Sequence, residues 1–177
     1  MQERKQAKWL KMCVGFDKSS ELLGYEKVSS FEEILENQGV LVYTNTGNSM
    51  MPLLRQHRDI LIIKRKEKNE RLHRFDIAFY KRDCGKYILH RILWVRKHDY
   101  VICGDNQWYP ERGITDQHIL GVLDSVVRDG KTIPLRQTAE HPHVSWKYRL
   151  YVHLWCDLYV LRAPIVFLIG KLKRRIK

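Results

Sequence analysis

The chain reads Val40-Leu41-Val42-Tyr43-Thr44 and, after two further residues, Gly47-Asn48-Ser49-Met50-Met51-Pro52-Leu53-Leu54. The first run is β-branched, aliphatic and aromatic, which predicts a strand. Gly47 lacks the Cβ that would clash at a sharp corner before Ser49, and Pro52 prevents the turn from continuing as an ordinary strand. We therefore expect a hydroxyl on a rigid corner with backbone N–H groups nearby, as the nucleophile of an acyl transfer needs. A turn without any chemistry is the alternative interpretation.

Length and composition indicate an ordinary globular chain. The 177 residues suffice for one domain with a substantial core, or for one domain plus a tail. Hydrophobic residues make up 44% and charged residues 29%, which excludes a disordered composition. The formal net charge of +12 predicts attraction to anionic partners, such as nucleic acid, acidic lipid headgroups or acidic peptides.

The four cysteines are widely scattered and form no Cys-x-x-Cys pair. They are Cys13, Cys84, Cys103 and Cys156. This spacing favours neither a zinc site nor a disulfide framework, and it indicates reduced thiols in a cytosolic setting. We expect no metal and no cofactor.

The N-terminal part is polar and contains no apolar core of signal-peptide length, so we expect neither a secretory signal nor an N-terminal membrane anchor. Residues 1–28 are predicted to be an extension with a short helix near residues 9–14. The first firm element follows, because Ser30-Phe31-Glu32-Glu33 matches a capping box and Gly39 is typical of a helix end.

Beyond Ser49 the chain predicts mostly strands, at residues 59–63, 75–80, 87–95 and 100–103, and one further strand made of residues 119–123 and 126–127. Turn signals separate them, including Asp83-Cys84-Gly85-Lys86 and Asp129-Gly130. The charged run at residues 64–74 is expected to be a solvated loop, and contact of its basic excess with an anionic partner is the alternative interpretation. Short strands at this spacing predict a β-barrel or folded sheet, and the lack of alternating helices argues against a doubly wound sheet.

The C-terminal segment, residues 146–177, is strongly apolar and ends in a basic cluster. Pro164 would kink a continuous helix there. The longest unbroken apolar run is shorter than the roughly 20 residues that a bilayer span needs. Three interpretations remain open: a helix resting on an acidic membrane surface, a helix pair capping the core, or a poor transmembrane span.

A serine nucleophile requires a base, and His90 is the strongest candidate among the eight histidines. It sits within the apolar strand sequence Leu89-His90-Arg91-Ile92, where a polar side chain is costly to bury without a partner. A histidine with a purely structural partner is the alternative. A third group must orient the imidazole. Asp105, after a strand end, and Glu111, in the next predicted loop, are both candidates, and the residues leave the choice open.

Five sequence motifs appear in order along the chain, at residues 47–54, 58–61, 89–92, 103–106 and 119–122. They read Gly-Asn-Ser-Met-Met-Pro-Leu-Leu, Arg-Asp-Ile-Leu, Leu-His-Arg-Ile, Cys-Gly-Asp-Asn and Ile-Leu-Gly-Val. Together they resemble the signal peptidase I and LexA-like serine peptidase superfamily, over residues 30–127. The resemblance implies a mainly β fold, a LexA-like folded-sheet barrel with a short N-terminal helix and a C-terminal helical tail. The implied divisions are an extension (1–28), a peptidase domain (29–136) and a tail (137–177).

The resemblance also implies roles for the candidate residues. Bacterial signal peptidases and LexA-type repressors use a Ser-Lys dyad, whereas the endoplasmic-reticulum and archaeal branch carries histidine at the position of His90. A Ser49–His90 pair is therefore implied. Glu111, in Glu111-Arg112-Gly113, stands where that branch has the aspartate of Asp-Arg-Gly. Asp105 matches the acid of Gly-Asp-Asn, which could hold the loop or the histidine, so both acids are kept.

The implied function is a serine endopeptidase that cleaves leader or signal peptides through an acyl-enzyme on Ser49. The Ser49 N–H would stabilise the oxyanion; Gly47 lacks the hydroxyl that some relatives place there, and Asn48 could replace it. With a histidine base, activity should rise with pH through an ionisation near neutrality.

Three departures from the family stand out. We expect no N-terminal membrane helix, Arg58 stands where family members have glycine, and we expect no helix-turn-helix in the short region before Ser30. The alternatives are a non-catalytic binding module that recruits acidic lipid or nucleic acid, and a LexA-like self-cleaving regulator. We expect a peptide or protein substrate, a membrane-associated or cytoplasmic location, contact of the tail with an acidic membrane, and no nucleic-acid substrate; the oligomeric state is left open.

Overall fold

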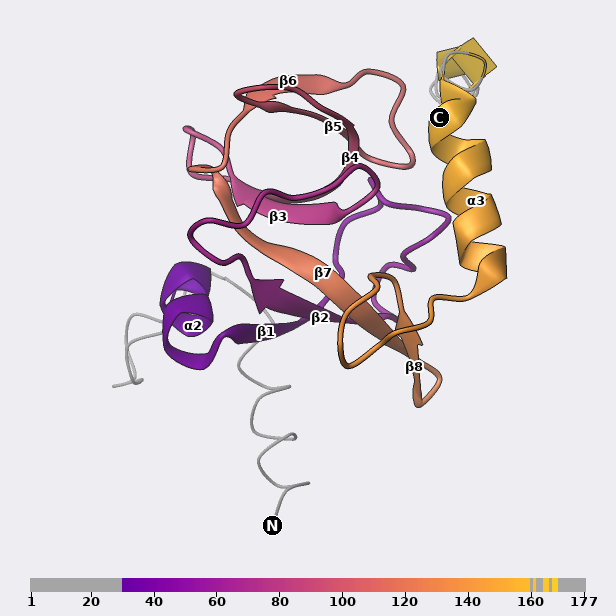
Figure 1. The fold of residues 1–177 in the computed structure, drawn as a ribbon. Coiled ribbons are helices and arrows are strands. Elements are labelled where there is room, and N and C mark those ends of the chain that lie inside the picture. Colours follow the sequence, from indigo (N-terminus) through magenta and orange to yellow (C-terminus); the bar gives the residue numbers. More distant parts are fainter. Residues whose placement is uncertain (1–29, 160, 162–163, 166, 169–177) are drawn as a thin grey trace, which may run out of the picture.

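The computed structural model describes residues 30–159, 161, 164–165 and 167–168 (Figure 1). The predicted N-terminal extension, its short helix, Cys13 and the basic C-terminal end lie outside these residues. Within them the elements follow one another in this order: α2 (Phe31–Gln38), β1 (Val40–Thr44), β2 (Ile60–Arg65), β3 (Ile77–Lys81), β4 (Tyr87–Val95), β5 (Tyr100–Cys103), β6 (Glu111–Ile114), β7 (Ile119–Arg128), β8 (Lys131–Pro134) and α3 (Trp146–Asp157).

The eight strands form one antiparallel sheet. The pairing order is β1-β2-β7-β3-β4-β5-β6, and β8 pairs with β7 beside this path. Because β1 and β6 stand at opposite ends of the order, the described sheet is open. The predicted mainly β fold, with a short helix before it and a helix after it, is confirmed. The specific LexA-like barrel stays a prediction.

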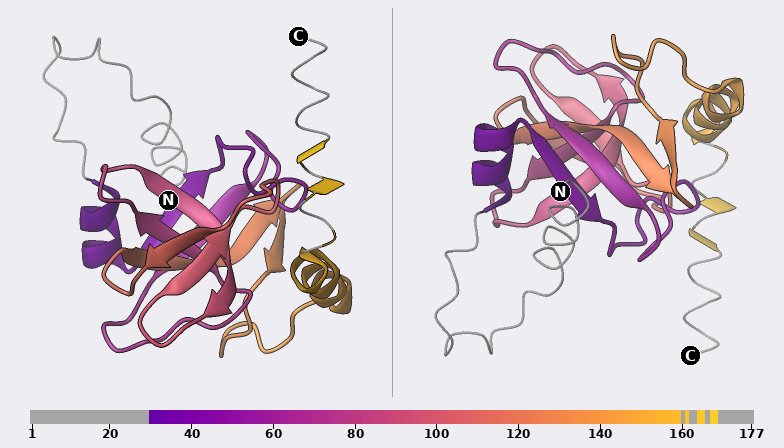
Figure 2. Two further views of the ribbon diagram at one scale, coloured as in Figure 1. Left: turned by 90° about the horizontal axis from the view of Figure 1, so that it is seen from above. Right: turned by 90° about the horizontal axis from the view of Figure 1, so that it is seen from below.

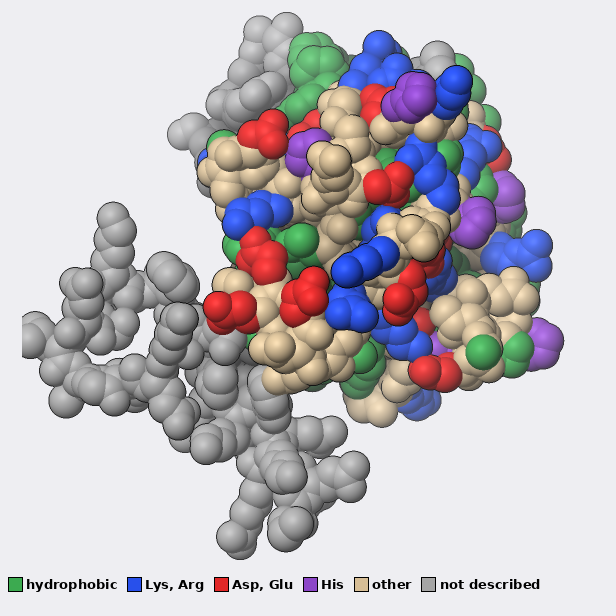
Figure 3. Space-filling model, turned by 60° about the vertical axis from the view of Figure 1, so that its left-hand side comes forward, with side chains coloured by type: hydrophobic (Ala, Val, Ile, Leu, Met, Phe, Trp, Pro, Cys, Tyr) green, Lys and Arg blue, Asp and Glu red, His purple; other side chains and the backbone are tan. Residues whose placement is uncertain are grey.

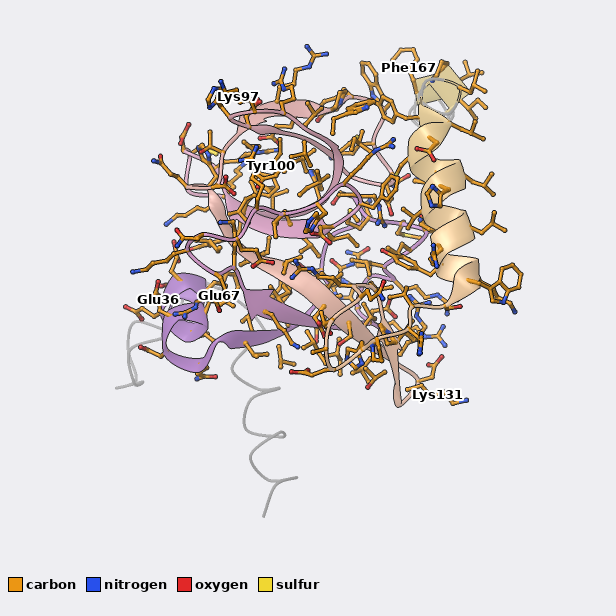
Figure 4. The ribbon with its side chains drawn as sticks, viewed as in Figure 1. Glu36, Glu67, Lys97, Tyr100, Lys131 and Phe167 are labelled. Carbon is orange, nitrogen blue, oxygen red and sulfur yellow. The ribbon has the colours of Figure 1, made fainter. Side chains whose placement is uncertain are left out.

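The long strand β7 joins the two halves of the sheet, since it pairs with β2, β3 and β8. Figure 1 shows β3 to β6 curling above β7, with β1, β2, β8 and α2 below it. Each half encloses apolar side chains. In the upper half, Tyr80, Ile92 and Tyr100 are fully buried, and Figure 4 shows Tyr100 within the curl. In the lower half, Leu35 of α2 packs with Leu41 and other side chains from β1, β2, β3 and β7.

The capping box predicted at the start of the helix is confirmed. The Glu33 N–H donates to Ser30 Oγ at 3.2 Å, and the Ser30 N–H donates to the Glu33 carboxylate at 3.1 Å. Gly39 ends α2 in the left-handed conformation, with φ of 72°. The helix therefore begins and ends where its sequence signals place it.

Three strand predictions need correction. The third strand begins at Ile77 rather than at residue 75, because Phe75 has φ of 80° and so lies in a turn. Strands β6 and β8 were not predicted. Each has four residues, and only Ile114 among the eight is fully buried, so neither carries an apolar pattern. The further strand predicted from residue 119 to residue 127 is confirmed, as the continuous strand β7.

The charged run at residues 64–74 is only partly a solvated loop, which corrects the prediction. Its first two residues belong to β2. Leu72 is fully buried in the upper core, and the Arg71 guanidinium lies 4.3 Å from the centre of the Tyr100 ring. The Lys66 side chain is largely buried 3.4 Å from Asp116. The run packs onto the upper half of the sheet, where its cations contact Asp116 and the Tyr100 ring.

The helix α3 packs along β4 and β5 (Figures 1 and 2). Val152, Cys156 and Tyr159 contact Leu93 and Cys103 in a third apolar cluster. Cys103 and Cys156 are buried, whereas Cys84 is exposed. No helix within the described residues has the length and apolar character needed to cross a bilayer.

A buried ion pair joins three segments of the chain. Arg91 of β4 donates from Nε and Nη2 to the Asp105 carboxylate at 2.9 and 2.8 Å, and both side chains are at most 2% exposed. The same guanidinium donates from Nη1 to the Phe75 carbonyl and to the Tyr148 hydroxyl of α3. Tyr151, also on α3, donates to Asp105 at 3.0 Å. The pair therefore fixes β4, the turn after β5 and α3 relative to one another.

Removing Asp105 should destabilise the protein strongly. Asp105→Ala would leave a fully buried guanidinium without its counter-charge, which typically costs about 3–5 kcal/mol of unfolding free energy. Chemical denaturation measures this. Arg58→Ala is the matched control, because its ion pair with Asp129 is more than half exposed and contributes little. Equal losses in the two variants would contradict the role given to the buried pair.

Candidate active site

The turn that carries Ser49 is anchored by two apolar side chains that follow the serine. Met50 and Leu54 are fully buried in the lower core, while Ser49 itself is half-buried. The Leu54 N–H donates to the Met50 carbonyl, and the Met51 N–H donates to the Asn48 carbonyl. Burial of Met50 and Leu54 therefore fastens the turn that presents Ser49 to the lower core.

Asn45, which the sequence reading passed over, organises the entry to this turn. Its side chain accepts from the Gly47 N–H at 3.2 Å and donates to the Gly47 carbonyl at 2.9 Å, and its carbonyl accepts from the His57 N–H. Short polar side chains commonly replace backbone pairing in this way at turns.

The reason given for Gly47 is wrong. Its φ is not positive, and an added Cβ would meet only Asn45 Oδ1 at 3.8 Å, an ordinary contact. The left-handed residue in this loop is His57, with φ of 56°, one position before Arg58. Arg58 stands where the resembled superfamily has glycine. The left-handed backbone conformation that favours glycine occurs one residue earlier, at His57.

The far end of the serine loop is held by a buried acid. Asp59 accepts from Arg128 Nε at 2.8 Å and from the Arg55 N–H at 2.7 Å. Arg128 also donates to the Leu53 carbonyl. Burial alone would raise the pKa of Asp59, but these hydrogen bonds outweigh burial and hold the pKa below its usual value. Asp59 thus stays charged and fixes the loop.

His90 lies in the middle of β4, with 3% of its surface exposed. Its Nδ1 lies 3.3 Å from the Tyr80 hydroxyl on the neighbouring strand β3. Burial lowers the pKa of His90 to about 4; the nearby Glu111 charge opposes this shift only in part. The imidazole is therefore neutral near pH 7, the state that a general base requires.

Glu111 reaches His90 through Tyr80. The Tyr80 hydroxyl donates to the Glu111 carboxylate at 2.8 Å, and Arg82 donates to the same carboxylate at 2.8 Å from Nε. Burial would raise the pKa of Glu111, but the bonds from Arg82 and Tyr80 lower it below its usual value. Burial and this charged neighbour raise the pKa of Tyr80. The acid is ionised and the phenol keeps its proton.

This network assigns the tautomer of His90. Because the single Tyr80 proton goes to Glu111, the Tyr80 oxygen can only accept from His90. The His90 proton then sits on Nδ1, which leaves a lone pair on Nε2. The neutral ring is therefore in the form that can take a proton from a hydroxyl.

Ser49 and His90 meet at Gly104. A Cβ built on Gly104 would lie 2.6 Å from the Ser49 carbonyl oxygen and 3.1 Å from His90 Nε2. The Asn106 N–H donates to the Ser49 carbonyl at 2.7 Å, and Asn106 Nδ2 donates to the Asn48 carbonyl. The Gly-Asp-Asn turn thus binds the serine loop, and the Ser49 carbonyl and His90 Nε2 both lie close to Gly104.

The two candidate acids have different surroundings. Asp105 is engaged with Arg91 and with α3, as described above, and its carbonyl accepts from Trp155 Nε1 at 2.7 Å. Glu111, at the start of β6 rather than in a loop, is linked to the imidazole through Tyr80. The geometry therefore favours Glu111 for orienting His90 and Asp105 for holding the turn.

A mostly apolar cleft of about 430 Å³ opens beside Ser49. It lies between α2, β1, β3 and β4. Its lining includes Phe31, Phe79, Tyr87 and Leu89, with Ser49 and Met50 at the turn. The Phe31 ring meets Tyr43, Phe79 and Tyr87 edge to face. Within the described residues, no group of three His, Cys, Asp or Glu side chains is placed to hold a metal ion.

Sequence reasoning missed Tyr80, Arg82 and Arg91. One signal was present for Tyr80: in the antiparallel β3–β4 hairpin, Ala78 pairs with His90 and Tyr80 pairs with Ile88. Residues two apart on a strand share a face, so Tyr80 and His90 are diagonal neighbours. Glu111 reaches Tyr80 from strand β6, and the sequence has no apolar pattern that predicts this strand.

Comparisons with protein-family models, with curated proteins and with solved structures found no match. The superfamily resemblance therefore stays a prediction carried by the five motifs, and the geometry of the site has to support the function by itself.

Gly104→Ala should disturb the site, because its Cβ would lie 2.6 Å from a backbone oxygen that is itself hydrogen-bonded. Overpacking of this kind typically costs about 1–3 kcal/mol. We expect that loss in denaturation experiments. Gly47→Ala is the control and should change stability by less than about 1 kcal/mol, because the site has room and ordinary φ. A tolerated Gly104→Ala would show that the serine and histidine segments are not held together at this point.

The reactivity of Ser49 should depend on pH with a low midpoint. The base acts only when neutral, so the labelling rate with a serine-directed phosphonate should rise as the pH increases through about 4, where His90 loses its proton. This replaces the near-neutral midpoint of an unperturbed histidine, about 6.5. Rates are compared only where circular dichroism shows folded protein. A midpoint near neutrality would mean that His90 is solvated in solution.

Proposed function

We propose that the protein is a serine endopeptidase of the signal-peptidase type, with Ser49 as nucleophile and His90 as general base. The observation that carries this proposal is the meeting of the Ser49 backbone and His90 Nε2 around Gly104. A neutral, buried imidazole close to a serine turn can act as the general base of an acyl transfer.

The mechanism follows from the proton positions. Ser49 Oγ attacks the carbonyl carbon of a peptide bond, and its proton passes to His90 Nε2. The tetrahedral intermediate collapses, the C–N bond breaks, and the imidazolium gives its proton to the leaving amine. A water molecule then attacks the acyl-enzyme, giving a proton to His90, which returns it to Ser49 Oγ as the acid product leaves.

Glu111 contributes to this cycle by stabilising the imidazolium. The negative charge of Glu111 favours protonated His90 and raises its pKa, whereas burial lowers that pKa. Since Tyr80 stands between them, the carboxylate acts through a hydrogen-bonded phenol rather than by direct contact. Arg82 keeps the carboxylate ionised. The base is thus neutral at rest and supported when it accepts a proton.

The oxyanion would be stabilised by the Ser49 N–H. Within the described part of the chain this N–H donates to no protein acceptor, whereas the Ser49 carbonyl is held by Asn106. A free backbone donor next to a fixed nucleophile is the usual geometry of an oxyanion hole. Asn48 is proposed as the second donor.

The cleft beside Ser49 favours a peptide as substrate. The aromatic and aliphatic lining of the cleft suits an apolar side chain near the scissile bond. Leader and signal peptides supply such segments. We propose in addition that the described sheet has the LexA-like barrel form.

Labelling by a serine-directed phosphonate tests the proposal. We expect wild-type protein to react and both Ser49→Ala and His90→Gln to lose reactivity by at least about a hundredfold, the scale of general-base catalysis. Ser145→Ala is the matched control: this exposed serine makes no side-chain cap bond, so reactivity should be unchanged. Circular dichroism confirms that each variant is folded. A folded wild type that does not react, or that reacts equally after Ser49→Ala, would favour a non-catalytic binding module.

A further inference from the structure

The helix α3 and the residues after it have two faces. One face packs on β4 and β5 through Val152, Cys156 and Tyr159. The other bears an apolar stripe, in which each side chain is roughly half exposed or more and follows the previous one by three or four residues. We call it the leucine stripe: Leu150, Leu154, Leu158, Leu161, Ile165 and Leu168. Three- and four-residue spacing places these side chains along one side of a helix.

An exposed aromatic group extends the leucine stripe at its C-terminal end. The Trp108 ring meets Tyr109 and Phe167 edge to face, with centroids 5.3 and 4.9 Å apart. Trp94 meets Tyr159 in the same way, and the Tyr159 hydroxyl donates to the Trp108 carbonyl. Figure 4 shows Phe167 beyond the end of α3, beside the β5–β6 loop. Trp94, Trp108, Tyr109 and Phe167 are all 40–53% exposed.

The C-terminal segment is strongly positive. Residues 146–177 contain one acid, Asp157, and eight cationic side chains: Lys147, Arg149, Arg162, Lys171, Lys173, Arg174, Arg175 and Lys177. Asp157 is paired with Arg74 at 2.7 Å. The face drawn in Figure 3 differs, because acidic and basic side chains alternate there without a large area of one sign. Strong positive charge is therefore combined with exposed apolar surface in the C-terminal segment.

We propose that the leucine stripe and its aromatic end dock on an anionic phospholipid surface. Apolar, aromatic and basic residues along one helix are the combination that binds the headgroup region of such a membrane. A second copy of this chain would bring a second segment of the same charge against the first, which disfavours self-association through the stripe.

Docking would bring the candidate active site to the membrane. On the inner face of α3, Tyr151 and Trp155 both hydrogen-bond Asp105. The next residue, Asn106, donates its N–H to the Ser49 carbonyl. The helix that bears the stripe thus also fixes the turn that holds Ser49. Resting on the proposed peptidase function, this inference makes the substrate a polypeptide presented at a membrane surface.

Vesicle sedimentation tests the docking. The full chain is mixed with vesicles of phosphatidylcholine alone or of phosphatidylcholine with phosphatidylglycerol. We expect binding to the anionic vesicles, weakened by salt. Leu154→Glu and Leu161→Glu should each reduce the partition coefficient about tenfold, because an apolar side chain is lost from the lipid contact. Val42→Glu is the matched control: Val42 is 50% exposed on β1, away from α3, and its replacement should leave binding unchanged.

Four outcomes would overturn the docking proposal. In the first two, the protein binds both vesicle types equally or binds neither. In the third, Val42→Glu reduces vesicle binding as much as the stripe variants do. In the fourth, the protein forms a dimer without lipid and Leu154→Glu abolishes it, which would assign the stripe to contact with a second copy. Phosphonate labelling without lipid is measured separately. If the wild-type protein is labelled but does not bind anionic vesicles, only the docking proposal is refuted. If it binds the vesicles but is not labelled, only the peptidase proposal is refuted.

Discussion

The buried pair of Arg91 and Asp105 is the constraint on which the rest of the arrangement depends. Taking two charges out of water is costly, and the cost is offset only when geometry and additional hydrogen bonds are good. Here Arg91 binds both carboxylate oxygens, a carbonyl and the Tyr148 hydroxyl, while Tyr151 binds Asp105. These partners come from four places in the chain. Satisfying the pair therefore sets the positions of His90, which precedes Arg91, and of Gly104, which precedes Asp105.

The two acids near the site divide two tasks between them. Asp105 neutralises an arginine and so stabilises the turn on which Ser49 rests. Glu111 acts on the imidazole at one remove, through Tyr80, and is itself held by Arg82. An acid in direct contact would raise the pKa of His90 strongly. With the phenol between them, burial prevails, and the ring stays neutral while its proton is kept on Nδ1.

The same helix connects the interior of the site with the outside of the molecule. Tyr148, Tyr151 and Trp155 of α3 contact the ion pair, and Leu150 and Leu154 on the other side contact solvent. An α-helix makes this possible because residues three or four apart share a face while those between them point elsewhere. One short segment can then support a polar network and carry an apolar docking surface.

By itself, the sequence determined the local elements. The capping box at Ser30, the hairpin containing His90 and the turn bearing Ser49 follow from caps, alternation and glycine-proline signals, which act over a few residues. Only the tertiary structure decided which acid serves His90, because Tyr80 and Glu111 are 31 residues apart and meet through a strand, β6, that has almost no apolar pattern. It likewise decided that Gly104, and not Gly47, is the glycine that the site requires. The close approach of two distant backbone segments does not alter the hydrophobic periodicity of either segment. Only their packing in the folded chain therefore shows which glycine is needed.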